Sequence, residues 1–551
     1  MDQIEKYQKW IKNKAVDENT KKELMHLSES DIIERFGYDL KFGTGGLRGI
    51  MEAGTNRMNI YTVRLATQGL ANEICSIGED AKKRGVVIAY DSRNNSKLFA
   101  YECASVLCAN EIKTFIFDDL RPTPELSFAV RYLGCIRGIV ITASHNPKEY
   151  NGYKVYGEDG GQIEPETANK ITDYIKKIDI FDDIKISETS KEIIVGDEID
   201  KAYIDAIKLQ SYGINIPDDF KVVYTPLHGS GNILVRKALH SIGVKNLFVV
   251  PEQELPDGDF PTVKSPNPEN AEAFTIAIEY AKKQNADIVF GTDPDSDRIG
   301  IAIKNNIGEY ITLNGNQTGA LLCEYILRKA SECSIIPENP IVVKTIVTTE
   351  MIKAITDKYN TNLIDVLTGF KFIGEQIKKL EDNSNSDRFM FGLEESYGYL
   401  KGTYARDKDA VVASLIITEL AAECKANGLT LYDKLTELYK TYGFYLEALE
   451  TKTLIGIDGK NKIEKIMSKF RSSALPFEFS KINDYTKGID GLPKSDVLKF
   501  FLKDKAWFAV RPSGTEPKIK FYFGVCAESE EKATRDLNAL KKAVLDFADI
   551  H

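Results

Sequence analysis

The sequence has no run of about eighteen consecutive apolar residues, the length of a membrane-spanning helix, so it predicts no membrane partner. Residues 1–6 are charged and lack the apolar core of a signal peptide. The formal net charge of −10 argues against a nucleic-acid-binding surface, although small anionic ligands need only a local cluster of donors. No C-x-x-C pair occurs, and the eight cysteines lie among apolar residues as reduced core thiols would. We therefore expect a cytoplasmic protein.

What the sequence does contain is an alternation of strand-like runs and helical patterns, which indicates α/β units. Several apolar runs, among them 86–90, 138–141 and 287–290, end directly in a polar loop. Ligands of open α/β sheets gather beyond the carboxyl ends of the strands. The repeated units therefore predict similar domains that each lend a loop to one central cleft.

We predict an α/β fold of four domains, because 551 residues exceed what a single core supports. Three similar α/β domains with mixed sheets precede a smaller C-terminal α+β domain. In that last domain two strands, 506–510 and 519–525, flank a polar loop, and a charged helix follows over 528–547. The predicted domains span residues 1–205, 206–315, 316–450 and 451–551.

The segment TASHNP, residues 142–147, follows the apolar run 138–141, which reads as a buried strand. On a turn closed by Asn146-Pro147, we expect the Ser144 hydroxyl to be presented rather than buried. A hydrolase elbow is excluded, because G-x-S-x-G needs glycine at positions 142 and 146. The remaining alternative is a polar turn that happens to hold Ser, His and Asn.

Three aspartates, Asp293, Asp295 and Asp297, alternate in a tight loop directly after the strand-like run 287–290. Such hard oxygen ligands suit Mg²⁺ or Ca²⁺. An EF-hand is excluded, because Arg298 and Lys304 stand where that loop needs Gly and Glu. Three carboxylates leave coordination places open, as expected for Mg²⁺ that shares a phosphate oxygen. The alternative is a solvated acidic turn.

A third loop, GLEESYG at residues 392–398, places a carboxylate and a hydroxyl two residues apart between glycines. Glu394 and Ser396 can accept and donate hydrogen bonds to vicinal sugar hydroxyls. We expect this loop to be exposed in the cleft. By itself the motif is equally typical of an ordinary loop.

A fourth loop, RPSGTEP at residues 511–517, combines backbone amides, two hydroxyls and an arginine into a phosphate nest. The run GTGGLRG at 43–49 is able to help in the same way. It is not a Walker loop, because Arg48 closes it, and the alternative is a flexible glycine turn. His228 lacks metal-ligand companions, so we interpret it as a loop residue and a candidate to face a substrate.

In this order the four loops resemble those of the α-D-phosphohexomutase family, enzymes that move a phosphoryl group around a sugar. The resemblance covers essentially the whole chain. It includes a T-G-x-K turn at 368–371 and an R-D-K-D segment at 406–409. The length and the early GTGGLR segment look more like the phosphoglucomutase/phosphopentomutase branch than the shorter phosphomannomutases.

The resemblance implies a phosphoserine at Ser144 and one Mg²⁺ per chain, bound by that residue together with Asp293, Asp295 and Asp297. Two lysines are the candidates for shuttling a hydroxyl proton, and we expect neighbouring cations and partial desolvation to lower their pKa. The implied catalytic residues are Ser144, Lys408, Lys154, Arg48 and His145. The implied substrate-binding residues are Arg48, Thr44, His228, Arg298, Thr368, Gly369, Glu394, Ser396, Lys408, Arg511, Ser513, Gly514 and Thr515.

The implied activity is the reversible interconversion of glucose 1-phosphate and glucose 6-phosphate through a phosphoserine enzyme. Glucose 1,6-bisphosphate is the implied intermediate and also the activator or primer. Mannose and pentose phosphates are the alternative substrates. A catalytically silent sugar-phosphate-binding regulator is the non-enzyme alternative, but it predicts loss of Ser144 or the aspartates, and all four are present. The expected partners are small sugar phosphates, and the chain is expected to act as a monomer or a homodimer.

Overall fold

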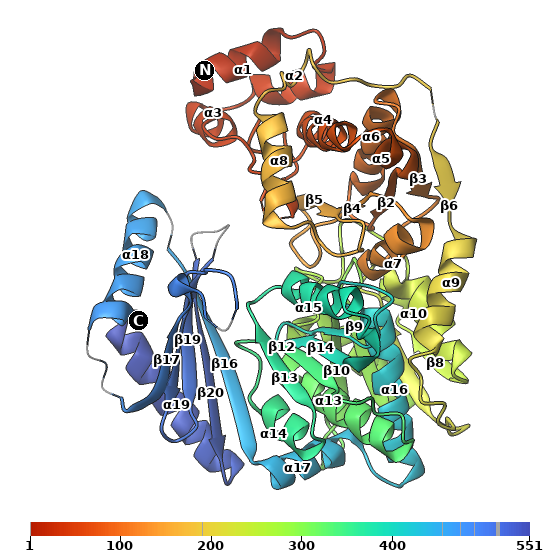
Figure 1. Ribbon diagram of the computed structural model, residues 1–551, viewed down its shortest axis with the longest axis vertical. Coiled ribbons are helices and arrows are strands. Elements are labelled where there is room, and N and C mark those ends of the chain that lie inside the picture. Colours follow the sequence, from red (N-terminus) through yellow and green to blue (C-terminus); the bar gives the residue numbers. More distant parts are fainter. Residues whose placement is uncertain are drawn as a thin grey trace.

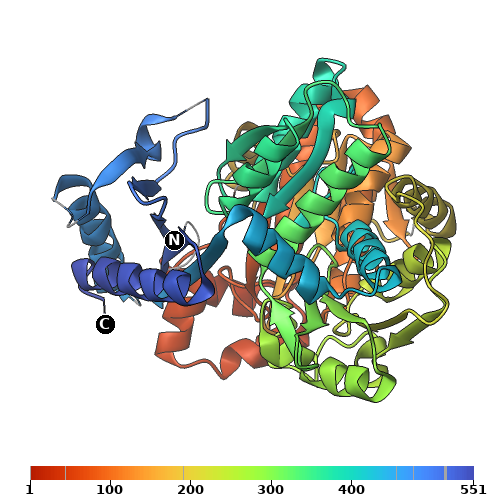
Figure 2. The same ribbon diagram turned by 90° about the horizontal axis from the view of Figure 1, so that it is seen from below.

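The computed structural model describes residues 2–43, 45–189, 191–454, 456–473, 475, 477–489, 491–513 and 518–550. Its strands form four sheets that follow one another along the chain. Three sheets are mixed and the last is antiparallel, so the predicted fold class is confirmed. Figure 1 shows the N-terminal part above the two middle parts, and in both Figure 1 and Figure 2 the C-terminal part stands to one side.

The first sheet has the strand order β1-β5-β4-β2-β3-β6. β2, β3, β4 and β6 run parallel, whereas β5 returns antiparallel from β4 and pairs with β1. β2, β3 and β4 are buried at every position, which explains why their sequences are apolar apart from the first residues of β3 and β4. The strands are β1 (Gly46–Ile50), β2 (Val86–Tyr90), β3 (Thr114–Phe117), β4 (Arg137–Ile141), β5 (Tyr150–Tyr156) and β6 (Ile193–Val195). The helices are α1 (Gln3–Lys12), α2 (Glu18–Met25), α3 (Glu29–Phe36), α4 (Ile60–Ile77), α5 (Glu79–Arg84), α6 (Ser96–Ala109), α7 (Thr123–Leu133), α8 (Pro165–Ile175) and α9 (Asp197–Lys208).

The second and third sheets have the orders β11-β10-β9-β7-β8 and β13-β12-β14-β15. The second part contains β7 (Lys221–Thr225), α10 (Gly231–Ser241), β8 (Asn246–Val249), α11 (Pro251–Glu254), η1 (Ala271–Phe274), α12 (Thr275–Gln284), β9 (Ile288–Thr292), β10 (Ile299–Lys304) and β11 (Tyr310–Leu313). The third contains α13 (Gly315–Glu332), β12 (Ile341–Thr345), α14 (Met351–Lys358), β13 (Asn362–Val366), α15 (Phe370–Asp382), η2 (Ser386–Arg388), β14 (Phe389–Glu394), β15 (Gly398–Leu400), α16 (Ala410–Ala426) and α17 (Leu431–Tyr442).

The same four-stranded unit occurs in all three mixed sheets. A central strand, which is β2, β7 or β12, pairs in parallel with the next strand on one side and the one after it on the other. The fourth strand, β5, β10 or β15, then returns as an antiparallel hairpin. Each hairpin turn holds a non-glycine residue in the left-handed region: Ser144, Ser296 and Tyr397, with φ of 52°, 50° and 66°. The serine, metal and sugar loops therefore occupy equivalent places in three repeated units.

One continuous hydrophobic core joins the second and third sheets. Helix α16 contacts α10, β9, β10 and β15, and nearly all its side chains are buried, which explains why its sequence has no polar stripe. Asp409 begins this helix by accepting hydrogen bonds from the amides of Val411 and Val412. Neither α16 nor any other helix within the described ranges is long and apolar enough to cross a membrane.

The fourth sheet is antiparallel throughout, in the order β16-β20-β19-β18-β17. A cluster of phenylalanines fills its core, in which the rings of Phe500 and Phe508 stack with centroids 4.5 Å apart. The predicted strands and helix of this part correspond to β19, β20 and α19. Its elements are β16 (Phe444–Thr453), α18 (Gly456–Ser472), β17 (Phe479–Asp484), η3 (Tyr485–Lys487), β18 (Leu498–Leu502), β19 (Trp507–Pro512), β20 (Lys518–Ala527) and α19 (Glu530–Phe547).

The predicted divisions of the chain do not all coincide with the ends of elements. The break near 205 falls inside α9, and the break near 450 falls inside β16. Because β16 pairs with β20 along its whole length, the C-terminal sheet begins before residue 450. The break near 315 falls at the first residue of α13. The four domain ranges themselves stay predictions.

Candidate active site

The turn between β9 and β10 gathers the three predicted metal ligands. Asp293, Asp295 and Asp297 are buried, and each offers an oxygen within 4.8 Å of the others. The Oδ1 atoms of Asp295 and Asp297 have no hydrogen-bond partner among the described residues. Burial and the two neighbouring carboxylates raise the pKa of Asp293 well above its usual range. Buried carboxylate oxygens that lack partners and repel one another fit a divalent cation.

Ser144 lies directly against this cluster, although 149 residues separate it from Asp293 in the chain. Its Oγ donates a hydrogen bond of 2.6 Å to Asp293 Oδ2 and lies 3.2 Å from His145 Nδ1. Ser144 is only 3% exposed, so the expectation that the hydroxyl is presented rather than buried is wrong. The reason is that the metal loop of the second sheet packs over the serine loop of the first.

Two lysines approach the aspartates from different parts of the chain, one on β5 and one in the segment between β15 and α16. Lys154 on β5 lies 2.9 Å from Asp295 Oδ2, and Lys408 lies 2.6 Å from Asp297 Oδ2. Burial alone would lower the pKa of both lysines, but the facing carboxylates outweigh it and raise both values. The expected lowering of the two pKa values is therefore wrong in this arrangement, because anions rather than cations dominate the surroundings.

The sugar loop lies between β14 and β15. Glu394 accepts a hydrogen bond of 2.8 Å from the amide of Gly369, which places the T-G-x-K turn beside it, with Thr368 and Ser396 partly exposed. Glu394 is 6% exposed, which corrects the expectation that this loop is exposed. Burial raises the pKa of Glu394 to about 7, despite the nearby cation of Lys408. This carboxyl is thus poised to change charge near neutral pH.

Two predicted phosphate-facing arginines lie on the rim of this cluster. Arg298 forms an ion pair with Glu269, and its amide donates to Asp293 Oδ1 at 3.0 Å. Arg48, an exposed residue of β1, donates to Asn146 Oδ1 of the serine loop at 3.2 Å. Arg48 of the GTGGLRG segment therefore contacts the serine loop. Thr44 lies outside the described residues.

The C-terminal sheet brings two cations side by side. Arg511 on β19 is opposite Lys520 on β20 and is partly exposed, and Ser513 donates its amide to the carbonyl of Lys518 at 2.7 Å. Burial and the charge of Arg511 lower the pKa of Lys520, whose charged neighbours also include Glu269 and Arg298. Lys520 is a phosphate-site candidate that the sequence analysis missed, because only its pairing with Arg511 identifies it. The predicted Gly514 and Thr515 lie outside the described residues.

His228 differs from its predicted role. Its Nδ1 lies 3.1 Å from the carbonyl oxygen of Leu255, and its Nε2 lies 2.9 Å from Thr262 Oγ1. The side chain is buried and the backbone has a φ of 61°. Both ring nitrogens are used within the second part of the chain, so His228 holds its loop and has no ring nitrogen left for a substrate.

Three further groups support the site without belonging to a recognised motif. Thr123, at the start of α7, donates its hydroxyl to Asp295 Oδ2 at 2.9 Å. Tyr156 donates to Asp407 Oδ2 at 2.7 Å, and Asp407 lies 3.6 Å from Lys408 Nζ. Arg93 binds backbone carbonyls of the serine loop. Each acts across a long sequence separation, so no local pattern indicates it.

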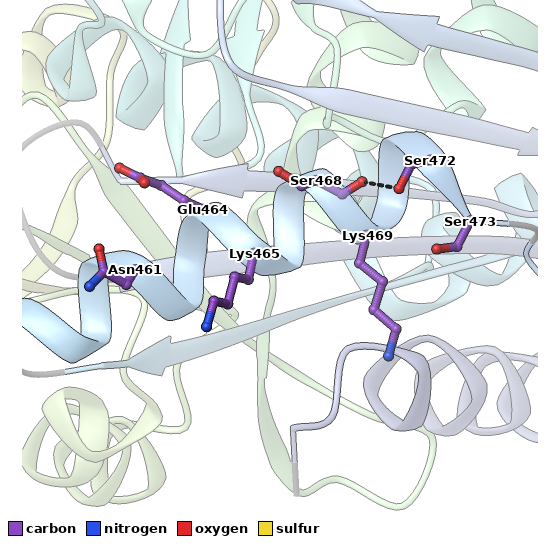
Figure 3. Close-up of a pocket in the computed structure, with 7 residues that line it drawn as sticks. All are labelled: Asn461, Glu464, Lys465, Ser468, Lys469, Ser472 and Ser473. Atoms are coloured by element: carbon purple, nitrogen blue, oxygen red, sulfur yellow. Dashed lines mark hydrogen bonds between the residues drawn. The ribbon is translucent and has the colours of Figure 1, made fainter.

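Two hollows in the described surface lie away from these loops. The first has a volume of about 580 Å³ and lies along α18, where lysine, serine, asparagine and glutamate side chains line it (Figure 3). Another, of about 430 Å³, lies around Lys82, Lys113 and Lys191. Neither contains Ser144, the aspartates or the sugar loop. The functional geometry therefore rests on the converging loops and not on these hollows.

Solved structures share this four-part fold. A putative phosphomannomutase from Thermus thermophilus superposes with a TM-score of 0.68 at 22% identity, covering 93% of this chain and 98% of that one. A phosphoglucomutase/phosphomannomutase family protein from Burkholderia thailandensis gives a TM-score of 0.70 at 18% identity, covering 92% and 97%. These likenesses define the fold class.

Sequence relationships define the family. Four domains match in order: phosphoglucomutase/phosphomannomutase alpha/beta/alpha domain I over residues 39–181, domain II over 201–308, domain III over 314–442 and the C-terminal domain over 461–541. Phosphoglucomutases of Staphylococcus aureus strains MSSA476 and USA300 are 38% identical over 534 residues, covering 93% of this chain and 94% of each relative. The chain belongs to the phosphoglucomutase/phosphomannomutase family, which confirms the resemblance to α-D-phosphohexomutases and with it the expectation of an enzyme.

Proposed function

We propose that this enzyme is a phosphoglucomutase, which interconverts glucose 1-phosphate and glucose 6-phosphate through a phosphoserine at Ser144 and a glucose 1,6-bisphosphate intermediate. The observation that carries the proposal is the 2.6 Å contact between Ser144 Oγ and a buried aspartate cluster with unpartnered oxygens. Three carboxylates beside the serine would repel a phosphoryl group. A cation that is bound by the carboxylates and by the phosphoryl group together would remove this repulsion. The phosphoglucomutase relatives support glucose as the sugar.

In this proposal Ser144, Asp293, Asp295 and Asp297 hold one Mg²⁺. The ion would neutralise charge on the transferred phosphoryl oxygens. The residues fit it because the carboxylates are buried and converge, and because two of their oxygens have no hydrogen-bond partner within the described part of the chain.

The chain's own residues then have distinct tasks. Glu394 and Ser396, with Thr368 and Gly369 beside them, orient the sugar hydroxyls. The phosphate that does not react is held by Arg511, Ser513, Gly514, Thr515 and Lys520. Arg48 and Arg298 stabilise charge at the reacting phosphate, with His145 adjacent to the serine.

Each half-reaction breaks the bond between phosphorus and one oxygen as it forms a bond to another. The first transfer moves the phosphoryl group from Ser144 Oγ to the free sugar hydroxyl. The bisphosphate then turns over, and its other phosphoryl group returns to Ser144. We assign the holding or moving of the hydroxyl proton to Lys408 and Lys154, and the position of both Nζ atoms beside the metal loop supports this assignment.

A cytoplasmic location belongs to the same proposal, and all eight cysteines are free. The proposed partners are small sugar phosphates, with glucose 1,6-bisphosphate as primer, and the enzyme acts as a monomer or a homodimer.

Side-by-side turnover of glucose, mannose and ribose 1-phosphates in coupled assays tests the choice of sugar. The proposal expects the highest kcat/KM with glucose 1-phosphate. A higher value with mannose or ribose phosphate would assign the enzyme to that sugar. Binding without turnover of any of the three would instead support a sugar-phosphate-binding regulator.

A further inference from the structure

A segment of the second part of the chain, residues 257–269 between α11 and η1, lies across the serine loop of the first part. The hydroxyl of Ser265 donates to the carbonyl of His145 at 2.8 Å, and Asp259 pairs with Lys148 at 3.2 Å. Gly258 approaches so closely that a Cβ there would lie 2.4 Å from the amide nitrogen of Asn94. We call residues 257–269 the strap. Its contacts tie the serine loop to the part that carries the metal ligands.

Arg93 lies between the strap and the serine loop. Its Nη1 donates to the carbonyls of Pro147 at 2.9 Å and Tyr150 at 3.1 Å, and its Nη2 donates to the carbonyls of Ser144 and Asn146. One planar guanidinium therefore binds four carbonyls of one loop, an arrangement that the fixed fork of arginine suits.

An aromatic ring and a carboxylate also contact the Arg93 side chain. The Arg93 guanidinium lies 5.1 Å from the ring centroid of Phe260 in the strap, a cation–π arrangement. Asp91 lies 3.5 Å from Arg93 Nε. Asp91 also accepts the hydroxyl of Thr142 at 2.6 Å, and Thr142 Oγ1 in turn accepts the amide of Ser144 at 2.8 Å. The loop is thus held by its carbonyls on one side and by the Ser144 amide on the other.

The backbone conformation shows why such support is needed. Ser144 has a φ of 52° and Phe260 a φ of 46°, a region that side chains with a Cβ rarely adopt. Strained residues of this kind persist only where the surroundings determine them. Arg93 contacts both of these residues, through the Ser144 carbonyl and the Phe260 ring.

We propose that Arg93 is a positioning residue for the reactive serine, and that Phe260 acts on Ser144 through Arg93. The inference rests on the proposed phosphoserine function. In this role Arg93 touches no substrate, but it sets the angle from which Ser144 Oγ meets the phosphoryl group and Asp293. A small misplacement of a reacting atom is enough to slow a reaction about a hundredfold.

The test compares Arg93→Lys with Arg137→Lys. Both arginines are buried, at 3% and 8% exposed, and Arg137 lies at the start of β4, the strand whose other end leads to Ser144. Lysine keeps the charge but cannot bind four carbonyls in a plane. We expect Arg93→Lys to lower kcat and the single-turnover transfer from phosphoenzyme to glucose 1-phosphate by about a hundredfold, with KM changed less than about threefold. Arg137→Lys should leave both rates near those of the parent.

A double-mutant cycle with Phe260→Leu tests the link through the strap. Alone, this change should lower the transfer rate about tenfold, and in the Arg93→Lys background it should have little further effect. Equal transfer rates for Arg93→Lys and Arg137→Lys would overturn the inference. So would full additivity of the effects of Arg93→Lys and Phe260→Leu. If Arg93→Lys does not fold, the single change Phe260→Leu is the test, and a transfer rate equal to that of the parent would overturn the inference. A parent enzyme that carries no phosphate on Ser144 would instead overturn the proposed function.

Discussion

Replacing Glu394 by glutamine gives two separable effects, because this carboxyl is both buried and placed to bind sugar hydroxyls. Burial raises its pKa from an ordinary 4.5 to about 7 in the folded protein. Below pH 4.5 the group is protonated whether the chain is folded or not. As the pH rises from 4.5 to 7 only the unfolded carboxyl ionises, so the free energy of unfolding falls, and above 7 the loss is complete.

The size of the effect follows from these two pKa values. At pH 8 the buried charge destabilises the folded protein by about 3 kcal/mol, and at pH 5 by about 1 kcal/mol. The glutamine side chain stays neutral and is still able to accept the hydrogen bond from Gly369. We therefore expect Glu394→Gln to have a higher free energy of unfolding than the parent. This gain should be about 2 kcal/mol larger at pH 8 than at pH 5. Urea unfolding at both pH values measures this difference.

The same change should lower the catalytic efficiency, although it raises the stability. A charged acceptor of sugar hydroxyls is worth about 1.5–3 kcal/mol, so kcat/KM should fall about ten- to a hundredfold. The matched control is Glu447→Gln on β16, since burial raises the pKa of Glu447 to about 7 as well. That variant should show a similar pH-dependent gain in stability with unchanged turnover. A gain in Glu394→Gln that does not vary with pH would refute the electrostatic reasoning, and parental kcat/KM would remove Glu394 from the site.

Three other changes test the remaining parts of the site. Arg511→Ala should weaken binding of both the 1-phosphate and the 6-phosphate by about ten- to a hundredfold, as titrations with each will show, whereas a loss confined to one substrate contradicts a shared phosphate site. Lys408→Met should lower kcat about a hundredfold or more, measured in steady state, and a drop in kcat/KM through KM alone would contradict a role in proton transfer. Chelation of the metal should stop turnover and lower the melting temperature, because Asp293, Asp295 and Asp297 then repel one another in a buried site. Restored Mg²⁺ should reverse both effects, and activity that survives chelation speaks against a metal enzyme.

Local patterns predicted the parts of this molecule that local forces determine. The apolar runs at 86–90 and 138–141 became β2 and β4, since strands buried on both faces need continuous apolar sequence. The alternating aspartates were found as a cluster, because their spacing within one tight turn already fixes their convergence.

Several features that depend on a partner distant in the chain were predicted wrongly or missed. Ser144 and Glu394 are buried rather than exposed, because other loops pack over them. The aspartates that raise the pKa of Lys154 and Lys408 the most, Asp295 and Asp297, lie in the metal loop of the second sheet. Lys520 is recognisable only from the register of β19 and β20. These features depend on contacts between segments that are far apart in the chain or lie on different strands, so no local pattern indicates them.

The central claim is that Ser144 carries the transferred phosphoryl group. Its hydroxyl lies 2.6 Å from Asp293 Oδ2, so Ser144→Ala removes the acceptor and donor atom while deleting a single oxygen. The control is Ser414→Ala, which deletes a buried hydroxyl bonded to the carbonyl of Ala410.

Intact mass and mutase activity, measured on the same preparations with added glucose 1,6-bisphosphate, decide the matter. The parent and Ser414→Ala should both carry a partial phosphate adduct of about 80 Da and turn over normally. Ser144→Ala should lose the adduct, and its activity should fall by several orders of magnitude. A Ser144→Ala enzyme that keeps more than a few per cent of parental activity would contradict the phosphoserine mechanism.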